Sequence, residues 1–403
     1  MRANNNQIFL DKIIWLATVF LFSSFLIFET KVWGKFVFIG LAILIFFLSA
    51  IKNKGKVCIK IEPFHVNTLI FVVYGFASIL WARNPTYTIL RMTTVFQTLV
   101  CIFIVYTYYR DQNSSRLLIN AIMWSGYLCS LYTISFYGMS TIKNIIAMGD
   151  RIGNDFTNIN GIGMISAISL VITFSRVIYK KFTYSIFFSP VALLLVVASG
   201  SRKALVVLLC GVLIVYFYKR IKKSSNPLNT IVEFLVAAVL ICILLYFLLQ
   251  LPFFSSVISR MDGLLNMFTG KGEVDVSTIH RIKYIEMGIE QFKKTPVFGI
   301  GIGNSPVLIG HNSYLHNNFI EILACGGILG FIFYYIPFIY ALYYLIIKNK
   351  KRDEDTVLCI ALLIIQIFMD FGQVSYFSKD VYFYLMLYYL QIKQIRKQKS
   401  MQT

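Results

Sequence analysis

The 403-residue chain lacks the short motifs that mark most metal-binding, nucleotide-binding and hydrolase sites. Its seven cysteines show no paired CxxC spacing, so neither a disulfide framework nor a zinc site is indicated. No HExxH is present, and the glycine-rich GIGIGN at residues 299–304 has neither GxGxxG spacing nor a Walker lysine. GxSxG is also absent, which removes the usual serine hydrolase arrangement. We therefore expect no cofactor, and we expect GIGIGN to form a tight turn close to other backbone.

Charged residues are scarce, at 14% of the chain, and acidic residues are scarcer still, with 18 Asp and Glu against 38 Lys and Arg. Apolar residues take their place, because 58% of the chain is hydrophobic and the mean hydropathy is +0.71. These values lie outside the range of soluble globular domains. Runs such as VALLLVVA are apolar on every face, whereas the strands of a β-barrel alternate. The sequence predicts an all-α, polytopic transmembrane helical bundle.

Candidate spans occur along the whole chain, which we read as a single integral membrane domain of residues 1–403. The first apolar run lacks a convincing small-residue cleavage site, so we take it as a retained span. About twelve windows are long enough to cross roughly 30 Å of hydrocarbon. They are 13–29, 32–51, 64–82, 88–109, 117–137, 161–179, 183–200, 203–219, 228–251, 326–347, 356–372 and 381–395.

The net charge of +20 lies in short clusters of Lys and Arg between the apolar runs. That distribution is typical of membrane orientation and not of nucleic-acid binding. It predicts that both termini are cytoplasmic, and that residues 252–325 form one large loop on the outer face of the membrane. Within this loop, TIHRIKYIEMGIEQFKK has apolar residues at helical spacing and predicts an amphipathic helix in contact with membrane lipids.

The outward segments hold the residues that could carry chemistry. His311 and His316 are five residues apart, so they do not stack on one helix face as a metal-binding pair would. Histidine can instead take a proton from a hydroxyl group. Three arginines on the same predicted side, Arg202, Arg260 and Arg281, offer forked donors that suit a diphosphate. Outward arginines can also simply anchor to lipid headgroups.

Four segments together resemble the bacterial O-antigen ligase/polymerase superfamily. They are RIGNDFTNINGIG (151–163), SGSRKA (199–204), HRIKYIEMGIEQFKKTPVFGIGIGN (280–304) and LHNNFIEILACGGILG (315–330). Two departures from the family pattern stand out: Ile159 replaces a common proline, and Cys325 stands where an acid is frequent.

The resemblance implies a metal-independent, inverting glycosyltransferase that acts on an undecaprenyl-diphosphate-linked glycan donor and acceptor. His316 would be the base that deprotonates the acceptor sugar hydroxyl, while Arg202 and Arg281 would bind the lipid diphosphate. The other candidate substrate-binding residues are Arg260, Arg151, Asn160, His311 and Asn317. A chain-length regulator and a flippase would be partners, and no nucleic acid would be.

Three functions remain open at this level. A polymerase joins lipid-linked repeat units of O-antigen or capsule, and we favour it. A ligase moves the finished glycan onto lipid A-core with the same donor chemistry. A polysaccharide flippase or transporter also has about twelve spans, but it usually places ionisable residues at the bilayer midplane or shows related halves.

Overall fold

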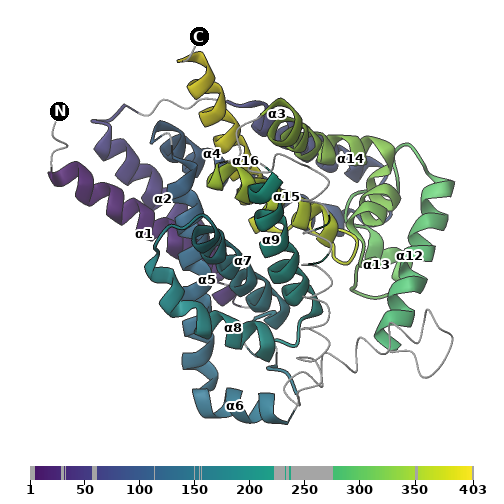
Figure 1. The fold of residues 1–403 in the computed structure, drawn as a ribbon. Coiled ribbons are helices and arrows are strands. Elements are labelled where there is room, and N and C mark those ends of the chain that lie inside the picture. The colour runs from purple at the N-terminus through teal and green to yellow at the C-terminus, as the bar shows by residue number, and fades with distance from the viewer. Residues whose placement is uncertain are drawn as a thin grey trace. The chain divides into compact units, whose positions relative to one another are not determined.

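The computed structural model describes residues 5–221, with short breaks at 29–30, 32, 57–60, 113, 149, 154 and 156, together with residues 232, 236, 276–349 and 353–401. All regular elements in these ranges are helices, as Figure 1 shows, which confirms the predicted all-α class. Arg260 and the predicted span at 228–251, apart from residues 232 and 236, lie outside the described residues.

Eight helices in the described ranges are long and apolar enough to cross a membrane. They correspond to eight of the twelve predicted windows and comprise Asn6–Ile27, Gly34–Lys52, Pro63–Leu80, Pro85–Arg110, Ser115–Tyr137, Ile159–Ile178, Arg202–Ile221 and Asn318–Lys348. Three other windows are helical but do not qualify. α8 (Ser189–Ala198) is short because Pro190 opens it, α15 (Glu354–Met369) has 16 residues, and α16 (Lys379–Ser400) becomes basic in its last turn.

The last of the eight spans begins earlier than the sequence suggested. Helix α14 (Asn318–Tyr343) starts eight residues before the predicted window at 326, so the segment predicted as the loop 252–325 already becomes helical at residue 318. The side chain of Asn317 causes this start, because it accepts a hydrogen bond from the backbone amide of Ile320 at 3.1 Å. The hydropathy of the sequence did not predict this first turn, because the N-terminus of α14 contains polar residues.

The chain divides into two compact units. Unit 1 comprises residues 1–52, 115–272 and 350–362. Its complete helices are α1 (Asn5–Ile27), α2 (Gly34–Lys52), α5 (Ser115–Tyr137), α6 (Met139–Ala147), α7 (Ile159–Ile178), α8 and α9 (Arg202–Ile221). The boundary between the units falls within α15.

Helix α7 is central to unit 1, because it packs against α5, α8 and α9 (Figure 1). Small residues let it approach α5 closely. The Ser169 hydroxyl donates to the Met123 carbonyl at 2.8 Å, and a Cβ at Gly126 would lie 2.1 Å from that hydroxyl. Close approach through Gly and Ser is the usual way in which membrane helices associate.

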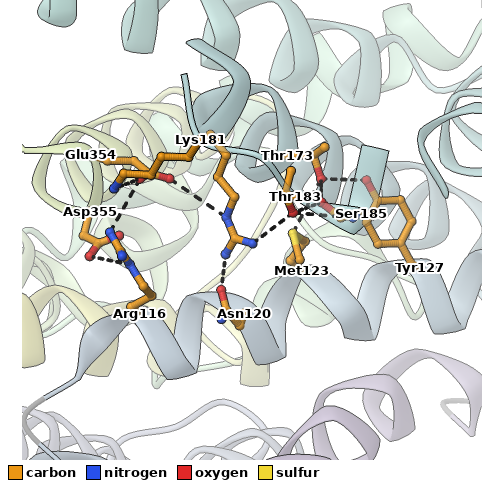
Figure 2. Close-up of polar contacts among 11 residues, drawn as sticks. Arg116, Asn120, Met123, Tyr127, Thr173, Lys181, Thr183, Ser185, Glu354 and Asp355 are labelled. Atoms are coloured by element: carbon orange, nitrogen blue, oxygen red, sulfur yellow. Dashed lines mark hydrogen bonds and ion pairs between the residues drawn. The ribbon is translucent and has the colours of Figure 1, made fainter. Parts of the chain in front are cut away.

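One end of unit 1 contains a network of ion pairs, drawn in Figure 2. The Glu354 carboxylate pairs with Arg116 at 3.5 Å, with Arg176 at 3.9 Å and with Lys181. Asp355 pairs with Arg116 at 3.3 Å. Burial raises the pKa of Asp355, and the charge of Arg116 opposes that rise. The network ties the start of α15 to α5 and α7, which lie far away in the sequence.

Arg176 extends this network along α7. Its guanidinium donates to Asn120 and, at 3.3 Å, to the hydroxyl of Thr183. From Thr183 the chain of hydrogen bonds continues through Ser185 and Thr173 to the Tyr127 hydroxyl, with steps of 2.7–2.9 Å (Figure 2). Because its members are partnered in this way, the polar set can be buried at the end of the helix bundle without leaving unpaired charge.

Unit 2 comprises residues 53–114, 273–349 and 363–403. Its helices are α3 (Pro63–Ala77), α4 (Pro85–Asp111), α12 (Val276–Lys294), α13 (Ser305–Ile309), α14 and α16. α14 packs against α3, α12, α13 and α16, and α4 packs against α3 and α16. The predicted amphipathic helix is thus present as α12, with Gly288 and Gln291 as its buried positions and Ile289 exposed.

Segments that lie far apart in the sequence contact each other within unit 2. The Arg83 amide, just after the third predicted span, donates to the Ile300 carbonyl in the large loop at 3.2 Å. Lys393 in α16 also pairs with Glu62, which directly precedes α3, at 3.5 Å.

The GIGIGN segment packs tightly against other backbone, as predicted. Gly299, Gly301 and Gly303 all have positive φ angles, between 66° and 97°. A Cβ at Gly299 would lie 2.4 Å from the backbone of Cys325, and one at Gly301 would lie 2.5 Å from Ala82. Glycine is required here both for the left-handed backbone and for the close approach.

We expect Glu354→Gln to lower the stability of the protein, because it leaves Arg176 without its counter-charge in a mostly buried setting. The loss should reach about 3 kcal/mol, moderated by the hydration of the exposed Arg116 and Lys181. Thermal unfolding of the detergent-purified protein measures it. Asp355→Asn, which weakens only the pair with half-exposed Arg116, should cost less than about 1 kcal/mol. Equal losses in the two variants would contradict the central role of Glu354.

We expect Gly299→Ala to destabilise the protein more than Gly310→Ala. Both positions have positive φ, 66° and 84°, but a Cβ at Gly310 would meet nothing within 4 Å. The strain of the left-handed backbone, about 1–2 kcal/mol, is therefore common to both. The clash with Cys325 adds about 1–3 kcal/mol at Gly299 alone. Matched thermal unfolding curves of the two variants test this, and indistinguishable midpoints would refute it.

Candidate functional site

Three of the four histidines gather around Tyr284 on α12. The Tyr284 hydroxyl lies 3.2 Å from Nε2 of His311, and the two rings meet edge to face with centroids 5.8 Å apart. The ring of His316 lies nearly parallel to that of Tyr284, at 6.3 Å and 11°. His280, one turn earlier on α12, is also stacked on Tyr284, at 6.0 Å. This group, which we call the histidine cluster, is formed by His280, Tyr284, His311 and His316.

The histidine cluster is accessible to solvent. His280 and His311 are exposed, and His316 and Tyr284 are partly buried. Tyr314 contacts the His316 ring from another direction, with centroids 4.5 Å apart. Imidazoles that are held by aromatic contacts and open on one side can exchange protons with a bound hydroxyl group near neutral pH.

His316 has an unusual backbone. Its φ angle is +58°, and the only other non-glycine residues with positive φ in the described ranges are Lys54 and Lys180, both in turns. The left-handed conformation costs a residue such as histidine about 1–2 kcal/mol. His316 directly precedes Asn317, which caps α14, so the strain sits where the loop enters the helix.

Two carboxylates are buried close to this entry. Glu321 on the first turn of α14 is 1% exposed, and Asp370 in the turn after α15 is 2% exposed. Neither of these acids is among the residues predicted from the sequence. A signal was present, because each is an isolated acid at the border of a long apolar run, where ionisable residues are costly and usually functional.

Arg281 lies on the same helix as Tyr284, three residues earlier, and is partly buried. Its side chain makes no ion pair with the residues that the structure describes. Two further arginines of unit 2 are committed to protein contacts. Arg83 donates to Gln291 at 2.9 Å, and Arg91 lies over the ring of Phe377 at 4.0 Å.

Asn317, predicted as a substrate contact, uses its side chain within the protein. Its Oδ1 accepts from the Ile320 amide, and its Nδ2 donates to the Phe371 carbonyl at 3.4 Å. Both polar groups of this side chain therefore contribute to the structure around His316.

Three other predicted residues, Arg151, Asn160 and Arg202, lie at one end of unit 1. The Ile152 amide, next to Arg151, donates to the Ala198 carbonyl at 3.0 Å. α7 begins beside this contact, with Asn160 in its first turn, and α9 begins at Arg202 just after it. A Cβ at Gly163 of α7 would lie 2.4 Å from the Ser199 hydroxyl, so this packing is close.

The four sequence segments thus meet in two pairs. Residues 151–163 contact 199–204 in unit 1, and residues 280–304 contact 315–330 in unit 2. The second pair is joined by backbone hydrogen bonds, including Ile300 to Ala324 at 3.2 Å and Ile328 to Pro296 at 2.8 Å.

Residues 187–335 match the model of a protein family described as O-antigen ligase. The match includes three of the four segments on which the resemblance rested, all except residues 151–163, and it is consistent with the O-antigen ligase/polymerase superfamily. The superfamily is one of glycosyltransferase-like membrane proteins, in agreement with the eight apolar spans. No curated protein matches the sequence.

Proposed function

We propose that this membrane protein is a glycosyltransferase that polymerises undecaprenyl-diphosphate-linked oligosaccharide repeat units of O-antigen or capsule. The reaction would take place on the outer face of the bacterial cytoplasmic membrane, with both termini of the chain in the cytoplasm. The observation that carries the proposal is the histidine cluster, which lies in the segment that matches the O-antigen ligase family and has Arg281 on the same helix.

In the proposed reaction His316 takes the proton of an acceptor sugar hydroxyl. The acceptor oxygen attacks the anomeric carbon of the donor, the bond from that carbon to the diphosphate oxygen breaks, and the configuration at the carbon inverts. Negative charge then accumulates on the lipid diphosphate, which leaves. Cations that are already in place near this group stabilise the transition state more than the ground state.

Arg281 and Arg202 are the proposed diphosphate ligands. A guanidinium remains charged and offers paired donors that match phosphate oxygens. Arg281 supports this role because its side chain makes no ion pair within the described part of the chain. Arg151, Asn160, Arg260 and His311 stay proposed substrate contacts, and His311 would be oriented by the Tyr284 hydroxyl.

A second function, transfer of finished polymer onto lipid A-core, is favoured by one observation: the matching family is described as O-antigen ligase. Donor binding and base catalysis would be the same in both reactions, so the residues above do not distinguish them. The family match also favours both transferases over a flippase or transporter.

We expect His316→Ala and Arg281→Ala to stop the formation of long polysaccharide in cells while the protein remains in the membrane. Loss of a general base typically costs a factor of about 10²–10⁴ in rate. His316→Asn should be equally inactive, and it is the cleaner variant because asparagine tolerates positive φ. Arg202→Ala should also lose the polymer. Surface glycan is measured on a gel and protein by immunoblot.

Lys283→Ala is the matched control for Arg281→Ala, because Lys283 is an exposed cation two residues away on α12. It should leave the polymer length unchanged. Long polysaccharide that persists in both the His316 and Arg281 variants would disprove the mechanism.

Deletion of the gene separates polymerase from ligase. A polymerase deletion should leave a single repeat unit attached to the acceptor, because ligation still occurs. A ligase deletion should leave long polymer on undecaprenyl diphosphate. The lipid-linked fraction and the surface fraction are compared on the same gel, and polymer accumulating on the lipid carrier would overturn the polymerase assignment.

A further inference from the structure

The strained backbone of His316 is held from both sides by buried polar groups. A residue keeps a left-handed conformation only when its surroundings fix it, and such residues concentrate at functional sites. The contacts on the two sides of His316 come from different parts of unit 2. Each includes one of the buried carboxylates.

Glu321 fixes the residue before His316. Its Oε2 accepts the backbone amide of Leu315 at 2.9 Å, and its Oε1 accepts the hydroxyl of Ser305 at 2.6 Å. Leu315 is fully buried, so its amide has no access to water as an alternative partner. The carboxylate therefore bridges the start of α13 and the segment that leads into His316.

The turn after α15 fixes the residues after His316. The Asn318 amide donates to the Asp370 carbonyl at 2.7 Å, and the Asn318 side chain donates to the Asp370 carboxylate at 3.3 Å. Oδ1 of Asn318 also accepts the amides of Ser375 and Tyr376, at 2.9 and 3.0 Å. This asparagine is thus bonded to both ends of the turn 370–376.

The Asp370 carboxylate is itself fully engaged. It accepts the Ser375 hydroxyl at 2.5 Å and the Tyr335 hydroxyl at 2.9 Å, in addition to Asn318. Buried networks in which every member is bonded are rigid, and removal of one member leaves the others unpaired. The rigid turn 370–376 is therefore suited to hold the start of α14 in one position.

We propose that Glu321 and Asp370 are positioning residues for His316. The two buried carboxylates fix the backbone on either side of it, so that its imidazole stays parallel to Tyr284 and directed toward the acceptor hydroxyl. The inference rests on the proposed function of His316 as the base. It assigns a purpose to two acids that take no direct part in the chemistry.

The test compares Glu321→Gln and Asp370→Asn in two backgrounds, the native chain and His316→Asn. Chain extension is measured in vitro with purified protein and a lipid-linked repeat unit, at equal amounts of folded protein. In the native chain each substitution should lower the rate about 10- to 100-fold, because a base displaced by about 1 Å loses that much activity. In the His316→Asn background neither should lower the residual rate further, because residues that act as a unit are non-additive.

Ser375→Ala provides a second measurement that changes no charge. It removes one of the three donors to Asp370, and it should shift the acid limb of the pH–rate profile, which reports the base. Loss of folded enzyme would scale that profile without shifting it. Asp355→Asn, which alters an acid in unit 1, is the control and should leave both rate and profile unchanged.

The outcomes separate the inference from the function on which it rests. Equal losses in both backgrounds, or an unshifted profile in Ser375→Ala, would show that the acids serve stability alone and would overturn the inference. Full activity of His316→Asn itself would instead overturn the assignment of the base. Native rates in both Glu321→Gln and Asp370→Asn would also overturn the positioning role, with the function left intact.

Discussion

Unit 2 depends on direct backbone contact between the end of its large loop and helix α14. Hydrogen bonds from Ile300 to Ala324 and from Ile328 to Pro296 join the two segments. They can form only because both surfaces lack side chains at the critical points: Gly299 faces Cys325, and Gly327 in α14 faces the carbonyl of Val297, where a Cβ would lie 2.2 Å away. The same contact fixes the end of α12 against α14. Tyr284 on α12 can therefore meet His316 at the start of α14 only while this contact holds.

The sequence predicted the helical class, most spans and the close packing of GIGIGN, because each depends on a local pattern. Apolar length reports a span, and alternating glycines report a turn with close approach. The prediction of the helix start was wrong at α14. The polar residues Asn318 and Glu321 made its first turn resemble a loop, although both are buried. The sequence also overestimated α8, because Pro190 and the preceding 3₁₀ turn Tyr184–Phe188 shorten that helix.

The site was predicted only as a set of residue types. His316, His311 and Arg281 could be selected for their chemistry, and the resemblance gave them roles. Their connection through Tyr284 could not be seen, because it joins α12 to a segment about thirty residues later by ring contacts that leave no periodic signal. Asp370 was still harder to find. Its partners Asn318 and Tyr335 are more than thirty residues away, and only the fold brings them together.

The pairing of segments has a consequence for the part of the chain that matches the family. Residues 187–335 contain SGSRKA but not residues 151–163, against which it packs, and they contain the entry to α14 but not the turn 370–376 to which Asn318 is bonded. The backbone of Ile300 likewise bonds to Arg83, and the Ile302 carbonyl accepts from Thr88. The matched region therefore packs against segments that lie outside it in the chain. We expect that it does not fold on its own. Its borders mark where sequence is shared within the family, and they do not mark the edges of a structural module.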